Sequence, residues 1–181
     1  MSRKRVKRKR RKMNPTYWVF CEGETEVAYV NFLKSYFRLP SIHIKAKVKG
    51  NSINQNYIDQ YLKGEFTTSK DQVFLLYDID APKMFDRLCK IEDCELLISN
   101  PCIEFWFLMH YKNHKAFCKE AFCIKEMKNR NGEYRKGVID EQLAEKLSDK
   151  MDKASERAKA LISPNNPSST LYRFVELLKE A

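Results

Sequence analysis

Short apolar runs alternate with amphipathic stretches along the first 111 residues of the chain. Tyr17–Cys21 is a β-rich run, and Val73–Tyr77 is a continuous apolar run. Ile42–Val48 instead alternates apolar with basic side chains, which is typical of a half-exposed strand near a sheet edge. Glu95–Ser99 is the fourth predicted strand. A strand that is buried on both faces is apolar throughout, so Val73–Tyr77 is predicted to lie in the centre of the sheet.

Each predicted strand is followed by a stretch with helical periodicity. The expected helices run from the Glu22–Glu26 loop to about Phe37, from Gly50 to near Gly64, onward from Pro82, and over Cys102–Tyr111. We expect Thr25 to cap the first of them. Strands and helices that alternate at this spacing predict an α/β fold, with a mostly parallel sheet and helices on both faces.

The pattern changes after Tyr111. Lys125–Gly137 is polar and basic, and it is predicted to be a mobile loop or a small hairpin. One long helix is expected over Ile139–Leu161, and a last helix over Thr170–Lys179. We therefore predict a basic arm over residues 1–15, an α/β core over residues 16–112, and a helical C-terminal extension over residues 113–181 that packs on the core.

The net charge of +10 is concentrated at the N-terminus. Nine of the 34 Lys and Arg residues lie there, and the rest nearly balance the 24 Asp and Glu residues. The nine are Arg3, Lys4, Arg5, Lys7, Arg8, Lys9, Arg10, Arg11 and Lys12. Such a run repels itself and is expected to be disordered alone; its uses are phosphate binding, contact with anionic membranes or solubility, and membrane contact is disfavoured because no transmembrane helix or amphipathic anchor accompanies the run. We expect the nine residues to bind nucleic acid. We expect Arg130, Arg135 and Lys136 to bind nucleic acid as well, with an exposed Tyr134 stacking on bases.

Other features of the sequence point to a cytoplasmic protein without a membrane segment. The apolar run after the basic residues is far shorter than a signal peptide, and no run is long enough to span a bilayer. The six cysteines form no C-x-x-C pair and are expected to stay reduced. His110, His114 and Cys118 have helical spacing, but core packing explains them better than a zinc site, which would need a fourth ligand.

Three acidic residues follow two of the predicted strands. Glu22 comes directly after Tyr17–Cys21, and Asp78 and Asp80 follow Val73–Tyr77. Ligands of open α/β sheets bind beyond the carboxyl ends of the strands, so these carboxylates meet if the two strands are neighbours. Carboxylate oxygens are hard ligands that suit Mg²⁺, with Mn²⁺ as the alternative, and a bound cation would offset their mutual repulsion.

Three further residues are secondary candidates for the same site. Glu26 lies in the first turn of the first helix, and Glu104 interrupts an otherwise apolar helix, where a buried carboxylate needs a partner. A role near the metal and a plain salt bridge are both open for Glu104. Asn100 follows the fourth strand and is expected to point into the crevice, to cap the next helix, or to do both.

Several motifs together resemble those of RloB-family proteins. They are FCEGETEVAYVNFL, LLYDID, SNPCIEFWFLMHY and NPSSTLYRFVELL, and the resemblance extends from about Tyr17 to Leu178. It implies a Toprim-like domain in which Glu22 acts as general acid or base and Asp78 and Asp80 bind metal. It also implies a role in bacterial anti-phage, abortive-infection systems, often beside an ATPase of the AAA or ABC type. Related Toprim nucleases cut tRNA, which makes RNA a candidate substrate.

Three hypotheses follow for the function. The first is a metal-dependent nuclease that cleaves RNA or DNA with Glu22, Asp78 and Asp80. The second is a non-catalytic module that binds nucleic acid or a partner, with the carboxylates serving as caps and ion-pair partners. The third, nucleotidyl transfer, ranks lowest because the chain has no Walker-type glycine loop. A homodimer is compatible with each of them.

Overall fold

The computed structural model of the chain describes residues 14–39 and 43–181. The nine basic residues between 3 and 12 lie outside this part of the chain, so their predicted role in binding nucleic acid stays a prediction. None of the described helices is long and apolar enough to cross a membrane.

Five strands of the described chain form one sheet. They are β1 (Thr16–Cys21), β2 (His43–Val48), β3 (Gln72–Asp78), β4 (Glu95–Asn100) and β5 (Ser168–Ser169). Their order is β2-β1-β3-β4-β5, and only the pairing of β5 with β4 is antiparallel. The predicted α/β fold is confirmed, with β3 in the centre and β2 at an edge. Strand β5 was not predicted, because a strand of two residues is too short to show a pattern in the sequence.

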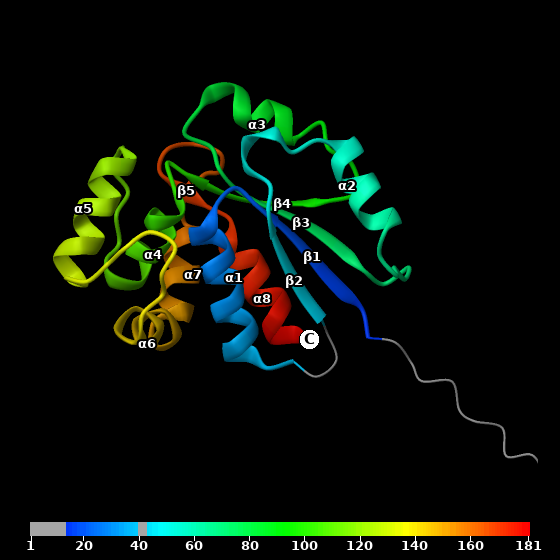
Figure 1. Cartoon of the computed structure of the whole chain (residues 1–181). Coiled ribbons are helices and arrows are strands. Elements are labelled where there is room, and N and C mark those ends of the chain that lie inside the picture. Colours follow the sequence, from blue (N-terminus) through cyan, green and yellow to red (C-terminus); the bar gives the residue numbers. More distant parts are fainter. Residues whose placement is uncertain (1–13, 40–42) are drawn as a thin grey trace, which may run out of the picture.

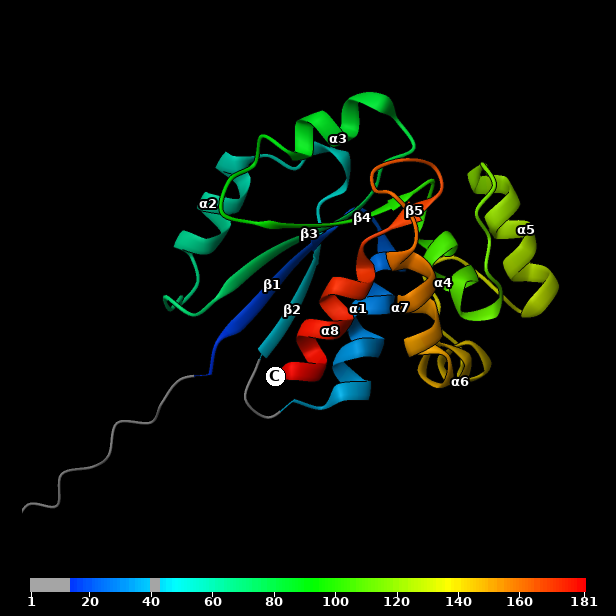
Figure 2. The ribbon, with the colours of Figure 1, turned by 180° about the vertical axis from the view of Figure 1, so that it is seen from behind.

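Helices cover both faces of this sheet (Figures 1 and 2). They are α1 (Glu24–Phe37), α2 (Gln55–Lys63), α3 (Pro82–Leu88), α4 (Ile103–Tyr111), α5 (Glu120–Arg130), α6 (Glu141–Asp149), α7 (Met151–Lys159) and α8 (Leu171–Glu180), with a 3₁₀ turn at Gly50–Ser52. Side chains of a strand alternate between faces, so β1 sends Val19 towards α1 and α8 and sends Phe20 towards α2. The sheet therefore separates two apolar clusters.

The larger cluster is built around α4. Residues 103–110 of this helix are all buried, as its uninterrupted apolar sequence predicts. It packs against α5, α6 and α7, and the same cluster includes Leu171, Phe174 and Val175 of α8. The C-terminal helices thus complete the core on the face of the sheet that also carries α1. The predicted boundary at residue 112 stays a prediction.

Two predictions for the C-terminal part are wrong. Residues 125–130 are not a loop or hairpin but belong to α5, because Cys123 and Met127 are buried in the cluster around α4. Residues 139–161 form two helices instead of one, with a break at Lys150, where φ is −113° and ψ is 15°. The break lets Leu147 and Met151 stay buried while the axes of α6 and α7 diverge (Figure 1).

Candidate functional site

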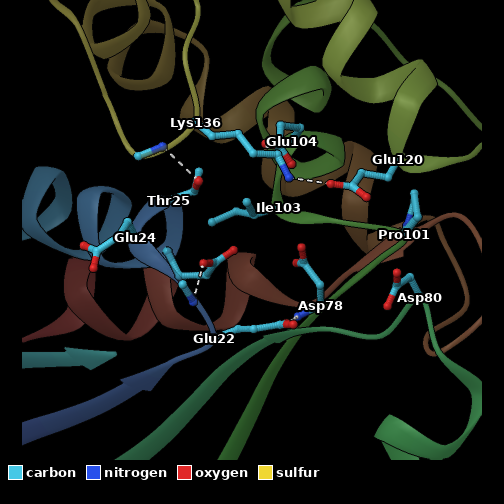
Figure 3. Close-up of a pocket in the computed structure, with 13 residues that line it drawn as sticks. Glu22, Glu24, Thr25, Asp78, Asp80, Pro101, Ile103, Glu104, Glu120 and Lys136 are labelled. Carbon is cyan, nitrogen blue, oxygen red and sulfur yellow. Dashed lines mark hydrogen bonds and ion pairs between the residues drawn. The ribbon is translucent and has the colours of Figure 1, made fainter. Parts of the chain in front are cut away.

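The topology brings the predicted carboxylates together. Strands β1 and β3 are parallel neighbours, with Cys21 opposite Leu76. Glu22 follows the end of β1, Asp78 is the last residue of β3, and Asp80 lies in the loop beyond it. All three line one cavity at the carboxyl edge of the sheet (Figure 3).

A hydrogen bond joins Glu22 directly to the end of β3. The Asp78 backbone N–H donates to Glu22 Oε2 at 2.9 Å, and the Glu22 N–H donates to the Leu76 carbonyl at 3.1 Å. Glu22 is therefore fixed on both its main chain and its side chain. The hydrogen bond to its side chain holds together Glu22 and Asp78, which lie 56 positions apart in the sequence.

Glu26 belongs to the same cavity and stabilises the loop between β1 and α1. Its Oε2 accepts the Gly23 N–H at 2.9 Å, and its side chain is 4% exposed. Gly23, and not Thr25 as expected, is the N-cap of α1. Thr25 is already inside the helix, and its hydroxyl oxygen accepts the Gly137 N–H at 3.0 Å. This bond ties the start of α1 to the segment between α5 and α6.

Glu104 enters the cavity from the first turn of α4. Its Oε1 accepts the Tyr134 hydroxyl at 2.8 Å and lies 3.9 Å from Lys136 Nζ. Its Oε2 is buried and has no hydrogen-bond partner among the described residues. The prediction of an exposed Tyr134 that stacks on bases is wrong. The residue is 3% exposed, and its hydroxyl donates a hydrogen bond to this buried carboxylate.

Lys136 is the cation that faces these acids. It forms ion pairs with Glu120 at the start of α5 and, at longer range, with Glu104. Burial alone would lower the pKa of Lys136, but the two carboxylates outweigh burial and raise it. Glu120 was not predicted from the sequence as a site residue. The only available signal was its position in the first turn of a helix, which was itself missed.

Asn100 lies at the side of the cavity and not inside it. Its Nδ2 donates to the Pro164 carbonyl at 2.8 Å, and its Oδ1 accepts from Asn166 at 3.1 Å. It lines an adjoining cavity that shares Asp80, Pro101 and Glu120 with the first. The expectation that it caps α4 is wrong, since Cys102 is the N-cap. Its amide instead anchors the chain before β5.

The main cavity has a volume of about 360 Å³ and is strongly acidic. Among the described residues that line it, seven are acidic and one is basic. The acids are Glu22, Glu24, Glu26, Asp78, Asp80, Glu104 and Glu120, and the base is Lys136. A cavity with this excess of acidic side chains attracts cations.

The family model for RloB-like proteins matches residues 17–178. The match runs from β1 into α8 and includes every residue that lines the cavity. This chain belongs to the RloB-like family. No curated protein and no solved structure matches it. The basic residues between 3 and 12 lie before the part that the RloB-like family model matches.

The pKa values in this RloB-like protein reflect a crowd of carboxylates. Burial raises the pKa of Glu26 to about 7, with further increases from Glu22 and Glu104. Burial also raises the pKa of Asp78 well above its usual range, followed by the effects of Glu26 and Glu22. The pKa of Glu22 is raised by burial, although the Asp78 N–H opposes the shift. Deprotonating the whole group is therefore costly without a compensating cation.

The donor chemistry of the cavity fits a hard divalent cation. All candidate ligands are carboxylate oxygens, and in the described part of the chain Glu104 Oε2 is a buried acceptor without a hydrogen-bond donor. Within residues 14–39 and 43–181, however, no three His, Cys, Asp or Glu side chains already stand in an arrangement that could hold a metal ion. The acids line one cavity without sharing one coordination centre.

The remaining predicted nucleic-acid contacts differ in their surroundings. Arg130 pairs with Glu126 at 3.0 Å, and Arg135 is exposed. Lys136 points into the acidic cavity, where its ion pairs hold it. Their binding to nucleic acid stays a prediction.

Proposed function

We propose that this RloB-like protein is a divalent-metal-dependent nuclease that cleaves phosphodiester bonds in RNA or DNA. The supporting observation is the hydrogen bond between Glu22 and the Asp78 main chain, in a cavity that Asp80 also lines. It places acids from two neighbouring strands where a parallel α/β sheet binds ligands.

Glu22, Asp78 and Asp80 are the proposed ligands of Mg²⁺ or Mn²⁺. A bound ion of this kind neutralises phosphate charge and lowers the pKa of coordinated water. Asp80 is exposed at the mouth of the cavity and is suited to meet an incoming phosphate, while Asp78 is half-buried behind it. Side-chain rotation would be needed to bring the carboxylates onto one centre, and Asp80 has the freedom for it.

Glu22 is the proposed proton-transfer group. The Asp78 N–H holds one of its oxygens, which fixes the orientation of the carboxylate that would take or give a proton. Its pKa is raised by burial, which brings it closer to neutral pH, where general acid–base groups work best. Lys136 is the cation of the cavity that can contact a phosphate oxygen.

Cleavage of a nucleic-acid panel tests this proposal. Labelled single-stranded and duplex RNA and DNA, with tRNA included, are incubated with the full chain in Mg²⁺, Mn²⁺ or EDTA. Cleavage should require the metal and disappear in Asp80→Asn. Glu133→Gln, which changes an exposed acid outside the cavity, is the control and should cleave normally. Equal cleavage by Asp80→Asn, or undiminished cleavage in EDTA, would refute the proposal.

A role in anti-phage defence beside an ATPase subunit is part of the proposal and rests on the resemblance to the RloB family. Co-expression with the product of a neighbouring ATPase gene tests it. Phage resistance that needs both proteins and an intact Asp80 supports the defence role, and resistance that persists in Asp80→Asn contradicts the nuclease role within it.

One observation favours a non-catalytic binding module instead. Two of the acids already accept main-chain N–H groups, Glu22 from Asp78 and Glu26 from Gly23, as purely structural carboxylates do. If this is their only role, binding of nucleic acid will be indifferent to Mg²⁺ and to Asp80→Asn, and no RNA or DNA of the panel will be cut.

A further inference from the structure

Three lysines form a row along the outer edge of the sheet. Lys45, Lys47 and Lys49 alternate along β2 and the residue after it, so their side chains lie on the same face. This strand pairs only with β1 in the described sheet, which leaves its other edge uncovered by any strand. Lys45 and Lys47 are exposed, and Lys49 is half-buried.

An aromatic ring lies beneath each ammonium group of the row. Lys45 Nζ lies 4.3 Å from the ring centroid of Trp18, and Lys49 Nζ lies 4.1 Å from that of Tyr57. Lys47 Nζ lies 5.7 Å from the centroid of Tyr61. Contacts of this kind hold a flexible side chain in place, while the other side of the ammonium group stays available to solvent.

The row ends at the carboxyl edge of the sheet, beside the main chain of Glu22, on the face opposite to the one that α1 and α4 cover. The Lys49 N–H donates to the Cys21 carbonyl at 2.9 Å, and the next residue after Cys21 is Glu22. Gly50 follows with a φ of +64°, and a Cβ at this position would lie 3.8 Å from the Glu22 carbonyl oxygen. The Tyr77 hydroxyl donates to the Gly50 carbonyl at 3.1 Å, which fixes this turn against β3.

Ion pairs with acidic side chains do not explain the positions of all three lysines. Lys45 pairs with Glu65 at 3.1 Å, in a partly exposed ion pair of the kind that contributes little and exchanges readily. In the described ranges 14–39 and 43–181, Lys47 and Lys49 have no carboxylate within ion-pairing distance. Packing of lysine stems over the rings explains the contacts, but it does not explain why three positive charges follow one another up to a negatively charged cavity.

We infer that Lys45, Lys47 and Lys49 bind successive phosphates of one nucleic-acid strand and guide it to the carboxylate cavity. Alternate residues of a β-strand are about 6.6 Å apart. This distance is close to the spacing of neighbouring phosphates in an extended single-stranded nucleic acid. The inference rests on the proposed function, because it assumes that the bound nucleic-acid strand runs towards the proposed catalytic residue Glu22. The ligand chemistry is the phosphodiester backbone, which RNA and DNA share.

The salt dependence of binding tests this inference. The triple variant Lys45→Gln/Lys47→Gln/Lys49→Gln is made in the full chain that also carries Asp80→Asn, so that bound oligonucleotides survive. Binding of a single-stranded RNA and a DNA of the same sequence is measured between about 50 and 200 mM salt. Each lost phosphate contact lowers the slope of log K against log salt by about 0.7, so the slope should fall by about 2. Affinity near 0.1 M salt should fall roughly a hundredfold.

A matched control removes the same charge elsewhere. Lys125, Lys128 and Lys153 are exposed on α5 and α7, and their triple Gln variant should keep a slope within about half a unit of the parent. If both triple variants lose slope equally, or if neither does, the row is not a binding site. If the first triple variant does not fold, Lys47→Gln and Lys49→Gln are measured singly, and each should lower the slope by about 0.7.

Cleavage by the chain with native Asp80 separates this inference from the proposed function. A normal slope in the Lys45/47/49 variant together with metal-dependent cleavage would overturn the lysine row and leave the nuclease in place. A reduced slope without any cleavage of the panel by the native chain would keep the row and overturn the nuclease. An equal loss for RNA and DNA supports backbone recognition, and a loss confined to one of them contradicts it.

Discussion

Glu104 is a buried carboxylate in the acidic cavity whose hydrogen bonding is only partly satisfied. It is 1% exposed and interrupts the apolar helix α4, yet within residues 14–39 and 43–181 only its Oε1 has a hydrogen-bond donor. The donor, Tyr134, comes from a segment 30 residues away. A carboxylate that is buried in this way is retained at a cost in stability, which is typical of functional groups.

Tyr134→Phe removes the one hydroxyl that bonds to Glu104. Hydrogen bonds to charged groups contribute about 1.5–3 kcal/mol, so the free energy of unfolding should fall by roughly this amount. Urea denaturation measures the change. Tyr36→Phe, at a side chain that is 48% exposed, is the control and should change stability by less than about 0.5 kcal/mol. Equal effects of the two variants would mean that the bond to Glu104 contributes nothing.

His110 makes stability depend on pH. Burial lowers its pKa to about 4, from an ordinary value of 6.5, so the unfolded chain binds a proton more readily than the folded chain. The contribution of the neutral imidazole is fully present above pH 6.5 and is lost as the pH falls towards 4. His110→Asn removes this titration and keeps a polar group near the Trp106 carbonyl, which His110 Nδ1 contacts at 3.0 Å.

The difference in unfolding free energy between the wild type and His110→Asn should shrink by about 2 kcal/mol between pH 7 and pH 5. Urea denaturation at the two pH values measures this difference. A constant difference would show that His110 is protonated equally in the folded and unfolded chains.

At the scale of elements, the segment between α5 and α6 holds Lys136 over the cavity. Its geometry depends on Gly137, which has a φ of +78° and donates its N–H to Thr25. A Cβ at this position would lie 3.4 Å from the Cβ of Glu24. The left-handed backbone of Gly137 and its hydrogen bond to Thr25 therefore hold the segment against α1.

Gly137→Ala should lower the free energy of unfolding by about 1–2 kcal/mol, because an L side chain is strained at this φ. It should also slow any metal-dependent cleavage, because Lys136 is displaced. Denaturation and cleavage assays measure the two effects. Gly132→Ala is the control: a Cβ there has no heavy atom within 4 Å, and its φ is not in the left-handed region. Identical behaviour of the two variants would remove the structural role of Gly137.

The elements of the sheet were predictable because their patterns are simple. The apolar run at Val73–Tyr77 and the alternation at Ile42–Val48 correctly placed a central and an edge strand. Their order made Glu22 and Asp78 neighbours, so the centre of the candidate site followed from the sequence. Helix α5 was not predicted, because only Cys123 and Met127 are buried among its many polar residues. Without this helix, Tyr134 was expected on the surface and Glu120 was not recognised as a site residue.

Over the whole molecule, two groups of like charges stand out. Seven acids line one cavity at the carboxyl edge of the sheet, and three lysines follow the outer strand β2 towards that edge. A cation inside the cavity would relieve the repulsion between the acids and reverse the local charge for an approaching phosphate. The fold thus supplies a negative pocket and a positive approach to it.

Mg²⁺ or Mn²⁺ should stabilise the folded protein. The pKa of Glu26 is raised from 4.5 to about 7 in the folded chain, so the folded chain holds this proton more tightly than the unfolded chain. The resulting stabilisation is fully present below pH 4.5 and is lost as the pH rises through 7. Above pH 7, a divalent ion at a hundred times its Kd should add about 2.7 kcal/mol, equivalent to several degrees in Tm. Thermal unfolding in 10 mM Mg²⁺ measures it. Glu133→Gln should keep the increase and Asp78→Asn should lose it, and an increase that survives Asp78→Asn would place the ion elsewhere.

The most direct test of the account is a double-mutant cycle of cleavage rates for Glu22→Gln and Asp80→Asn in saturating Mn²⁺. Groups that act as one unit are strongly non-additive. Each single variant should lose at least roughly a hundredfold in rate, and the double variant should be little slower than the slower single variant. Wild-type rates in the single variants would contradict the claim that the acids at the carboxyl ends of β1 and β3 form one catalytic site, and so would losses that multiply in the double variant.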